Sequence, residues 1–210
     1  MKAIRLSLFA LLTLTAAHAD LMMYNVTLNT APLIGHPAGP FSIGFEFADG
    51  SGIGDGNNFV VISNFNFGAG GPSGPPLTFG IAYGDLSSAV VMTDATPASV
   101  FIQSFDPGTT LSFLLQVTTN VDAGTPDEFI MSILDNTFTP IPTTATSPLS
   151  PFLQIDIDSS NPTVQTFQSD AVGVGQPLVS AVPEPSAVLS TLTMLCLVWA
   201  TRPRRFGRRM

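Results

Sequence analysis

Positive charge is missing from almost the whole length of this chain of 210 residues. No lysine or arginine lies between Arg5 and Arg202, whereas all 15 acidic residues lie from Asp20 to Glu184, so that segment has a formal charge of −15. Because proteins bind nucleic acids by neutralising phosphates with Lys and Arg, we expect no DNA or RNA partner. The same shortage excludes recognition of anionic ligands by lysine or arginine side chains.

Cysteine and histidine are almost as scarce. The only cysteine, Cys196, lies in an apolar run close to the C-terminus, so residues 20–181 can form no disulfide and no thiolate metal site. The only histidine after residue 19 is His36, and no G-x-S-x-G nucleophile motif occurs. These absences argue against zinc chemistry and against a serine or cysteine hydrolase. They predict a protein that is not an enzyme.

Sustained helical periodicity is also missing between Asp20 and Ala181. Short runs of β-branched and aromatic residues alternate with clusters of glycine, proline, asparagine and aspartate. Within Phe41–Phe47 every second residue is apolar, which is the period of a half-buried strand in an antiparallel sheet. The predicted strands are Leu21–Leu28, Phe41–Ala48, Phe59–Phe67, Leu77–Tyr83, Ala89–Thr93, Val100–Phe105, Thr110–Thr118, Glu128–Leu134, Phe152–Ile157 and Thr163–Gln168. We therefore expect residues 20–181 to form a single antiparallel β-sandwich, jelly-roll-like in kind.

Two segments contain too many strand-breaking residues to fit this pattern. Residues 68–76, rich in glycine and proline, are predicted to be an irregular loop. Residues 139–151, rich in proline, threonine and serine, are predicted to be extended and solvated. The second segment could be a linker between subdomains or an O-glycosylated stretch. A long loop within one domain is favoured because only two predicted strands follow it.

The first 19 residues have the three parts of a secretory signal peptide. Lys2 and Arg5 form a charged start, Leu6–Ala16 is an apolar stretch, and Ala19 ends an A-x-A cleavage site before Asp20. We therefore expect the chain to be exported by the Sec translocase and cut by signal peptidase between Ala19 and Asp20.

The C-terminal 29 residues, 182–210, contain three elements in order. A short motif precedes an apolar run, Ala187–Thr201, which is followed by a basic cluster. The motif is Val182, Pro183, Glu184, Pro185 and Ser186, and the basic residues are Arg202, Arg204, Arg205, Arg208 and Arg209. The prolines keep the motif extended, the apolar run can enter a bilayer as a transmembrane helix, and the arginines favour the cytoplasmic side. We therefore expect a membrane-sorting tail, with residues 20–181 outside the cytoplasm.

This tail resembles the PEP-CTERM sorting signal of Gram-negative bacteria, which membrane enzymes called exosortases process. The resemblance implies an inner-membrane intermediate, processing near the motif, and delivery to the cell envelope, the outer surface or the extracellular medium. An ordinary single-pass anchor is the alternative. The apolar run would form about 22 Å of helix against a hydrocarbon core of about 30 Å, and such a short segment suits transient retention before cleavage.

The segment Asp49–Asn58 is the best candidate for a metal site. Its oxygen-bearing side chains are Asp49, Asp55, Asn57 and Asn58, and its glycines let carbonyl groups turn inward, as the oxygen-rich coordination of calcium requires. The segment does not match the EF-hand spacing. A hairpin connection in which Gly, Asp and Asn supply positive φ angles is the favoured interpretation, and it requires no cofactor.

The resemblance links such sorting systems to exopolysaccharide and biofilm matrix. The favoured function is therefore that of a non-enzymatic surface or matrix component that is associated with exopolysaccharide. A carbohydrate-binding module is the first alternative, for which the available aromatic residues are Phe59, Phe65, Phe67 and Tyr83, although such residues are more often part of a core. A glycosidase is the second, using two carboxylates from Glu46, Glu128 and Asp156. Asp156 and Asp158 alternate with isoleucines, however, and most simply occupy a solvated strand face.

Overall fold

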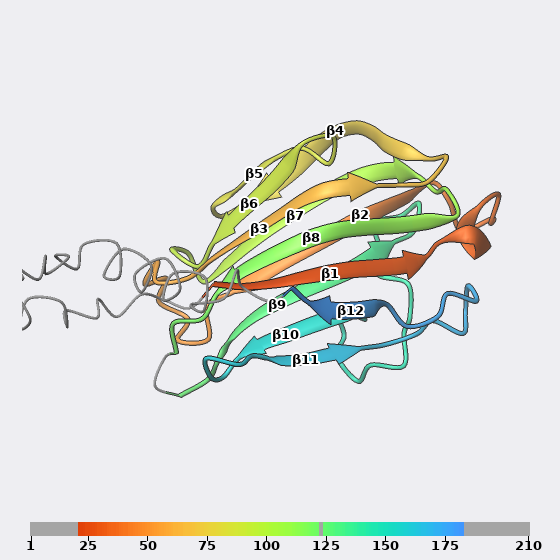
Figure 1. Cartoon of the computed structure of the whole chain (residues 1–210). Helices are drawn as coiled ribbons and strands as arrows, with labels where there is room; N and C mark the ends of the chain where they lie inside the picture. Colours follow the sequence, from red (N-terminus) through yellow and green to blue (C-terminus); the bar gives the residue numbers. More distant parts are fainter. Residues whose placement is uncertain (1–20, 122–123, 183–210) are drawn as a thin grey trace, which may run out of the picture.

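The computed structural model describes residues 21–121 and 124–182 (Figure 1). In these ranges twelve strands form two six-stranded antiparallel sheets, with one 3-10 turn, η2 (Ala31–Leu33), and no α-helix. The strands are β1 (Leu21–Asn29), β2 (Phe41–Ala48), β3 (Phe59–Asn66), β4 (Gly71–Phe79), β5 (Ala82–Gly84), β6 (Ala89–Thr93), β7 (Ala98–Asp106), β8 (Thr110–Thr118), β9 (Asp127–Leu134), β10 (Leu153–Ile157), β11 (Thr163–Thr166) and β12 (Leu178–Ala181). The prediction of an all-β, β-sandwich-like fold is confirmed.

The predicted terminal signals fall outside this part of the chain. The signal peptide, its cleavage site at Ala19 and Asp20, and the sorting tail from Pro183 onwards are not among the described residues. Within the described ranges no helix is long and apolar enough to span a membrane.

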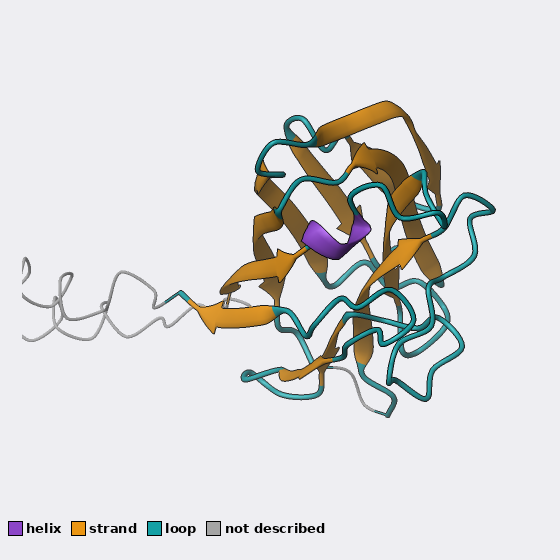
Figure 2. Ribbon diagram, turned by 90° about the vertical axis from the view of Figure 1, so that its right-hand side faces the viewer, coloured by secondary structure: helices purple, strands orange, loops and turns teal. Residues whose placement is uncertain are grey.

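Most connections between strands cross from one sheet to the other. Sheet A has the order β12-β1-β8-β3-β6-β5, and sheet B has the order β11-β10-β9-β2-β7-β4. The start of β1 and the end of β12 lie together, because Tyr24 pairs with Ala181 and the Val182 N–H donates to the Met23 carbonyl at 2.8 Å. Both ends of the described chain therefore leave from one end of the two layers (Figure 1), and η2 lies at the opposite end, which faces the viewer in Figure 2.

The core lies between the two sheets and is rich in phenylalanine. Phe45, at the centre of β2, has no exposed surface, and its ring centroid lies 6.2 Å from that of Phe101 and 5.9 Å from that of Phe129 in the same sheet. Phe113 of sheet A meets the same ring edge-on at 5.9 Å. Aromatic pairs in this geometry each contribute about 0.5–1.5 kcal/mol beyond the burial of their surface. Phe45 therefore joins the two layers.

The strand predictions hold best where one face of a strand is buried. The predicted bounds of Phe41–Ala48, Ala89–Thr93 and Thr110–Thr118 match β2, β6 and β8, and most other ends differ by one or two residues. The long loop is also found where it was expected, between β9 and β10. Three strands follow it instead of two, because β12 was missed.

The main error concerns residues 68–76, of which the part from Gly71 onwards belongs to strand β4. This strand forms the edge of sheet B and pairs with β7, with a register shift between Ser73 and Leu77 that accommodates Pro75 and Pro76. Proline lacks an N–H group, so it is tolerated at an edge, where one side of the strand makes no ladder hydrogen bonds. The glycine and proline content of residues 68–76 therefore suggested a loop, whereas the structure has an edge strand from Gly71 onwards.

A second error concerns Leu77–Tyr83, predicted as one strand but divided by the structure between the two sheets. Gly80 has φ 64°, and a Cβ atom there would lie 2.3 Å from the carbonyl oxygen of Ala98. Only glycine fits that approach, so the chain turns at this point. It leaves sheet B after Phe79 and enters sheet A as β5.

Candidate functional site

The oxygen-bearing side chains of Asp49–Asn58 do not meet at one point. The carboxylate of Asp49 is largely buried and caps its own turn, accepting hydrogen bonds from the N–H (2.7 Å) and hydroxyl (3.0 Å) of Ser51. Asp55 instead accepts hydrogen bonds from the backbone and side-chain nitrogens of Asn57 at 3.1 and 3.0 Å. Across residues 21–121 and 124–182, no three or more His, Cys, Asp and Glu side chains are placed to hold a metal ion. A calcium site in this loop therefore stays a prediction.

The fourth residue of that set, Asn58, belongs to a buried polar cluster at the end where both chain ends leave. Its backbone N–H donates to Asp94 Oδ2 at 2.9 Å, and its side-chain amide donates to Asp127 Oδ2 and to the Asn120 carbonyl, both at 2.7 Å. Its Oδ1 accepts from the Thr118 hydroxyl and the Asn120 N–H, both at 2.9 Å. One asparagine thus connects segments that follow β6 and β8 with the start of β9.

Asp94 and Asp127 form an acid pair in this cluster, with exposed fractions of 0% and 1%. Among the described residues no donor reaches Asp94 Oδ1, and no lysine or arginine is present to balance the charge. Burial, with a contribution from the nearby Asp127 carboxyl, raises the pKa of Asp94 to about 7. A proton on Asp94 satisfies both groups, because its O–H can donate to Asp127.

The outward face of sheet B has an apolar centre, which is unusual for the solvent side of an antiparallel sheet. Val100 and Ile102 of β7 point outward on one side of Gly44, and Ile130 and Leu134 of β9 lie on the other side. Gly44 of β2, which lies between these two strands, has no side chain, so the outward surface of the sheet is recessed there. This recessed apolar surface is called the groove floor below. Val100 and Ile102 are half-buried, and Ile130 and Leu134 are buried although they lie on the outward face.

The apolar face continues onto the edge strand of sheet B. Phe79 of β4 pairs with Val100, and Leu77 pairs with Ile102, so their side chains share the outward face. Their exposed fractions are 58% and 50%. Three strands, β4, β7 and β9, therefore contribute apolar side chains to one side of the molecule.

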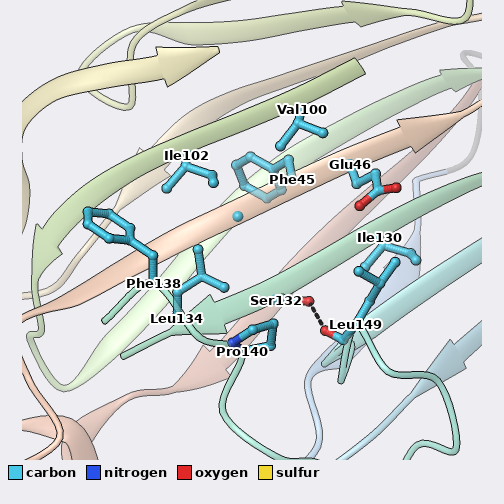
Figure 3. A pocket seen from close by; sticks show the side chains of 11 residues that line it. Phe45, Glu46, Val100, Ile102, Ile130, Ser132, Leu134, Phe138, Pro140 and Leu149 are labelled. Carbon is cyan, nitrogen blue, oxygen red and sulfur yellow. Dashed lines mark hydrogen bonds between the residues drawn. The ribbon is translucent and has the colours of Figure 1, made fainter. Parts of the chain in front are cut away.

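A groove of about 200 Å³ lies over this floor (Figure 3). One wall is the long loop between β9 and β10, which contributes Phe138, Pro140 and Leu149. The loop is fastened to the sheet, because the Ser132 hydroxyl donates to the Leu149 carbonyl at 2.8 Å. Figure 3 shows Phe138 at one end of the groove and Glu46 at the other.

Phe138 is held over the groove in a backbone conformation that large side chains rarely adopt. Its φ is 59° and 60% of its surface is exposed. The turn is braced by Asp135, whose carboxylate accepts hydrogen bonds from the Thr137 N–H and hydroxyl at 2.8 and 2.7 Å and from the Thr139 N–H at 3.0 Å. The Thr137 hydroxyl is the main cause of the lowered pKa of Asp135. Conformations of this kind cost about 1–3 kcal/mol and gather at functional sites.

The three carboxylates predicted for a glycosidase lie on this same face. Glu46 of β2 lines the groove, and Glu128 of β9 pairs directly with Asp156 of β10. Both oxygens of Asp156 accept hydrogen bonds, from Gln154 at 3.0 Å and Gln165 at 3.2 Å. Asp156 therefore occupies the polar strand face that was expected for it.

The ionised forms of both glutamates are disfavoured. Burial raises the pKa of Glu46. Burial, followed by repulsion from Asp156 and Glu46, raises the pKa of Glu128. Within the described ranges no residue supplies a positive charge to offset this repulsion.

The remaining aromatic candidates lie away from the groove or in the core. Phe67 is buried and Phe65 packs against the core, whereas Phe59 and Tyr83, on sheet A, are 40% and 56% exposed. His36 behaves as a loop histidine, because its Nδ1 accepts a hydrogen bond from a neighbouring backbone N–H at 3.2 Å.

Sequence reasoning missed Phe138 and the groove floor. The floor had a signal: Val100–Ile102 and Phe129–Met131 are continuous apolar runs, which place apolar side chains on both faces of a strand. Phe138 had none, because its position over the sheet depends on how the loop folds back. Comparison of the chain with models of known protein families, with curated proteins and with solved structures gives no match.

Proposed function

We propose that the protein is an exported, non-enzymatic component of the cell envelope or extracellular matrix that binds polysaccharide through the sheet B groove. The observation that carries the proposal is the exposed ring of Phe138, braced over an apolar floor, with the carboxylate of Glu46 at the other end. Sugar rings present apolar C–H faces and hydroxyl edges, so a site for them combines an aromatic surface with a few polar groups.

Export and exosortase processing are proposed on the sequence of the two terminal segments. The two described ends lie together, because the Val182 N–H donates to the Met23 carbonyl, so both terminal segments leave from one end of the domain. If a tail at that end attached the domain to the membrane, the groove would lie on the side of the domain, on the outward face of sheet B, and not at the attached end. The strand neighbours β1-β8-β3-β6 in one sheet and β2-β7-β4 in the other support a jelly-roll-like topology.

The binding proposal can be tested with the exported protein and a panel of soluble oligosaccharides, by titration calorimetry. Phe138→Ala should weaken binding at least about tenfold, since stacking on one aromatic ring is worth about 0.5–1.5 kcal/mol beyond the area buried. Tyr83→Ala, which removes an equally exposed aromatic ring from sheet A, is the matched control and should leave affinity unchanged. Equal effects of the two substitutions would contradict a site in the groove.

The paired carboxylates favour glycoside hydrolysis as a second candidate function. Glu128 and Asp156 lie directly opposite each other, and Glu46 is one step away on the neighbouring strand. A raised pKa is the property of the acid in such enzymes, and Glu128 has it. Release of reducing ends from a bound oligosaccharide, lost in Glu128→Gln, would establish this function in place of simple binding.

A further inference from the structure

The groove has a charged end, and this limits the ligands it can accept. Glu46 lines the groove opposite Ile130, and Glu128 is the next outward-facing residue along β9. Diagonal neighbours of this kind on antiparallel strands are roughly 7–8 Å apart. Asp156 extends the row onto β10, as the direct partner of Glu128. An apolar half and an anionic half therefore lie side by side on one face.

No positive charge from the described residues balances the carboxylates of the anionic half. Neither glutamate carboxylate accepts a hydrogen bond from the residues that the structure describes, and burial opposes the ionised form of each. Glu128 is also repelled by Asp156 and Glu46. No lysine or arginine lies in the described ranges, so none of these residues supplies the missing positive charge, and a cationic ligand would supply it. A bound cation would relieve the repulsion at the moment of binding.

We infer that the groove selects polysaccharides of amino sugars that carry free, protonated amino groups. This inference depends on the proposed function, because it names the class of polysaccharide that the same groove would bind. The C–H face of one sugar would pack on Phe138 and the aliphatic floor, while the ammonium group of a neighbouring sugar donates to Glu46 and Glu128. Acidic polysaccharides are excluded, because their carboxylates would meet this row without an intervening cation.

Three oligosaccharides of equal length and linkage provide the test: oligomers of glucosamine, of N-acetylglucosamine and of glucose. Binding to the exported protein is measured at about pH 6, below the usual pKa of an amino group, so that the ligand is cationic and favours the ionised form of both glutamates. The glucosamine oligomer should bind about tenfold more tightly or better, the difference expected of one charge-assisted hydrogen bond. Its advantage should shrink as salt is added.

Variants separate a specific site from general attraction to an acidic protein. Glu46→Gln should reduce the affinity for the glucosamine oligomer to that for the N-acetylated one. Asp158→Asn removes the same charge from an exposed position, Asp158 being bonded to Thr163 outside the groove, and should leave the preference intact. A lysine oligomer that binds as tightly as the glucosamine oligomer would overturn the inference, because charge alone would then explain the affinity.

The same titrations distinguish the inference from the function on which it depends. Equal or tighter binding of the N-acetylated or glucose oligomer, lost in Phe138→Ala, would overturn the preference for amino groups and leave polysaccharide binding standing. Absence of binding by all three oligomers would refute polysaccharide binding in the groove. A preference that survives Glu46→Gln would refute the assignment of the charged end.

Discussion

Replacing Asp94 tests whether the buried acid pair is held together by a proton. An ordinary aspartate has a pKa of about 3.9 in an unfolded chain, whereas that of Asp94 is about 7 in the folded protein. Between these two values the folded state keeps a proton that the unfolded state has lost. The contribution of Asp94 to the free energy of unfolding should therefore be greatest below about pH 4, fall as the pH rises towards 7, and then level off.

The size of the effect follows from the pKa of Asp94. A difference of about three pKa units, at 1.36 kcal/mol for each unit, corresponds to at most about 4 kcal/mol of stability lost across this interval. Asp94→Asn keeps an oxygen that can accept from the Asn58 N–H, and its amide can donate to Asp127 as the protonated acid would. The substitution should remove this part of the pH dependence and make the protein more stable than the parent above pH 7.

Urea unfolding between pH 4 and pH 8 at constant ionic strength measures both effects. Asp158→Asn is the control, because the Thr163 hydroxyl lowers the pKa of that exposed carboxyl, so its own contribution is lost only as the pH falls below about 4. The control should keep the parent slope between pH 4 and pH 7. The same slope in Asp94→Asn would show that no proton on Asp94 holds the acid pair together. Calcium that stabilises the parent but not Asp94→Asn would show a metal ion between the carboxylates in place of the proton.

The alternation of apolar and polar residues predicted most of the strands, because the core lies between two sheets and each of these strands buries one face against it. In β2 every second side chain meets the other sheet, so the sequence Phe41–Phe47 records burial directly. At β4 the local sequence pattern fails to predict the strand. Its glycines and prolines are compatible with a loop and with an edge strand, and the difference depends on whether β7 lies beside it. That partner is more than twenty residues away, so no local window contains the information.

The candidate site was predictable only in part, for the same reason. Glu46, Glu128 and Asp156 could be proposed as acids from their type, but their common face depends on the register of β2, β9 and β10. The meeting of Asp94 with Asp127 depends on Asn58, a candidate calcium ligand from the sequence, which donates hydrogen bonds to both carboxyl groups. The sequence shows which residues carry carboxyl and amide groups, but hydrogen bonds between distant segments determine which of these groups meet.

Three further results are expected. Intact-mass analysis of the envelope form should show a chain that ends near Pro183–Pro185 and lacks Arg202–Arg209; a mature protein that keeps these arginines would indicate a simple membrane anchor. Calcium and magnesium at matched ionic strength should raise Tm equally, because both screen the acidic surface; a calcium-selective increase that is lost in Asp55→Ala would place a site in the Asp49–Asn58 loop. Phe45→Ala should lower the free energy of unfolding by about 3–5 kcal/mol, the usual cost of removing a buried phenylalanine ring. The upper part of that range is expected because the ring contacts phenylalanines of both sheets, so no single neighbour can move to fill the cavity. A loss below about 2 kcal/mol in urea unfolding would mean that the sheets close over the cavity, and that the contacts of Phe45 are not needed to join the two layers.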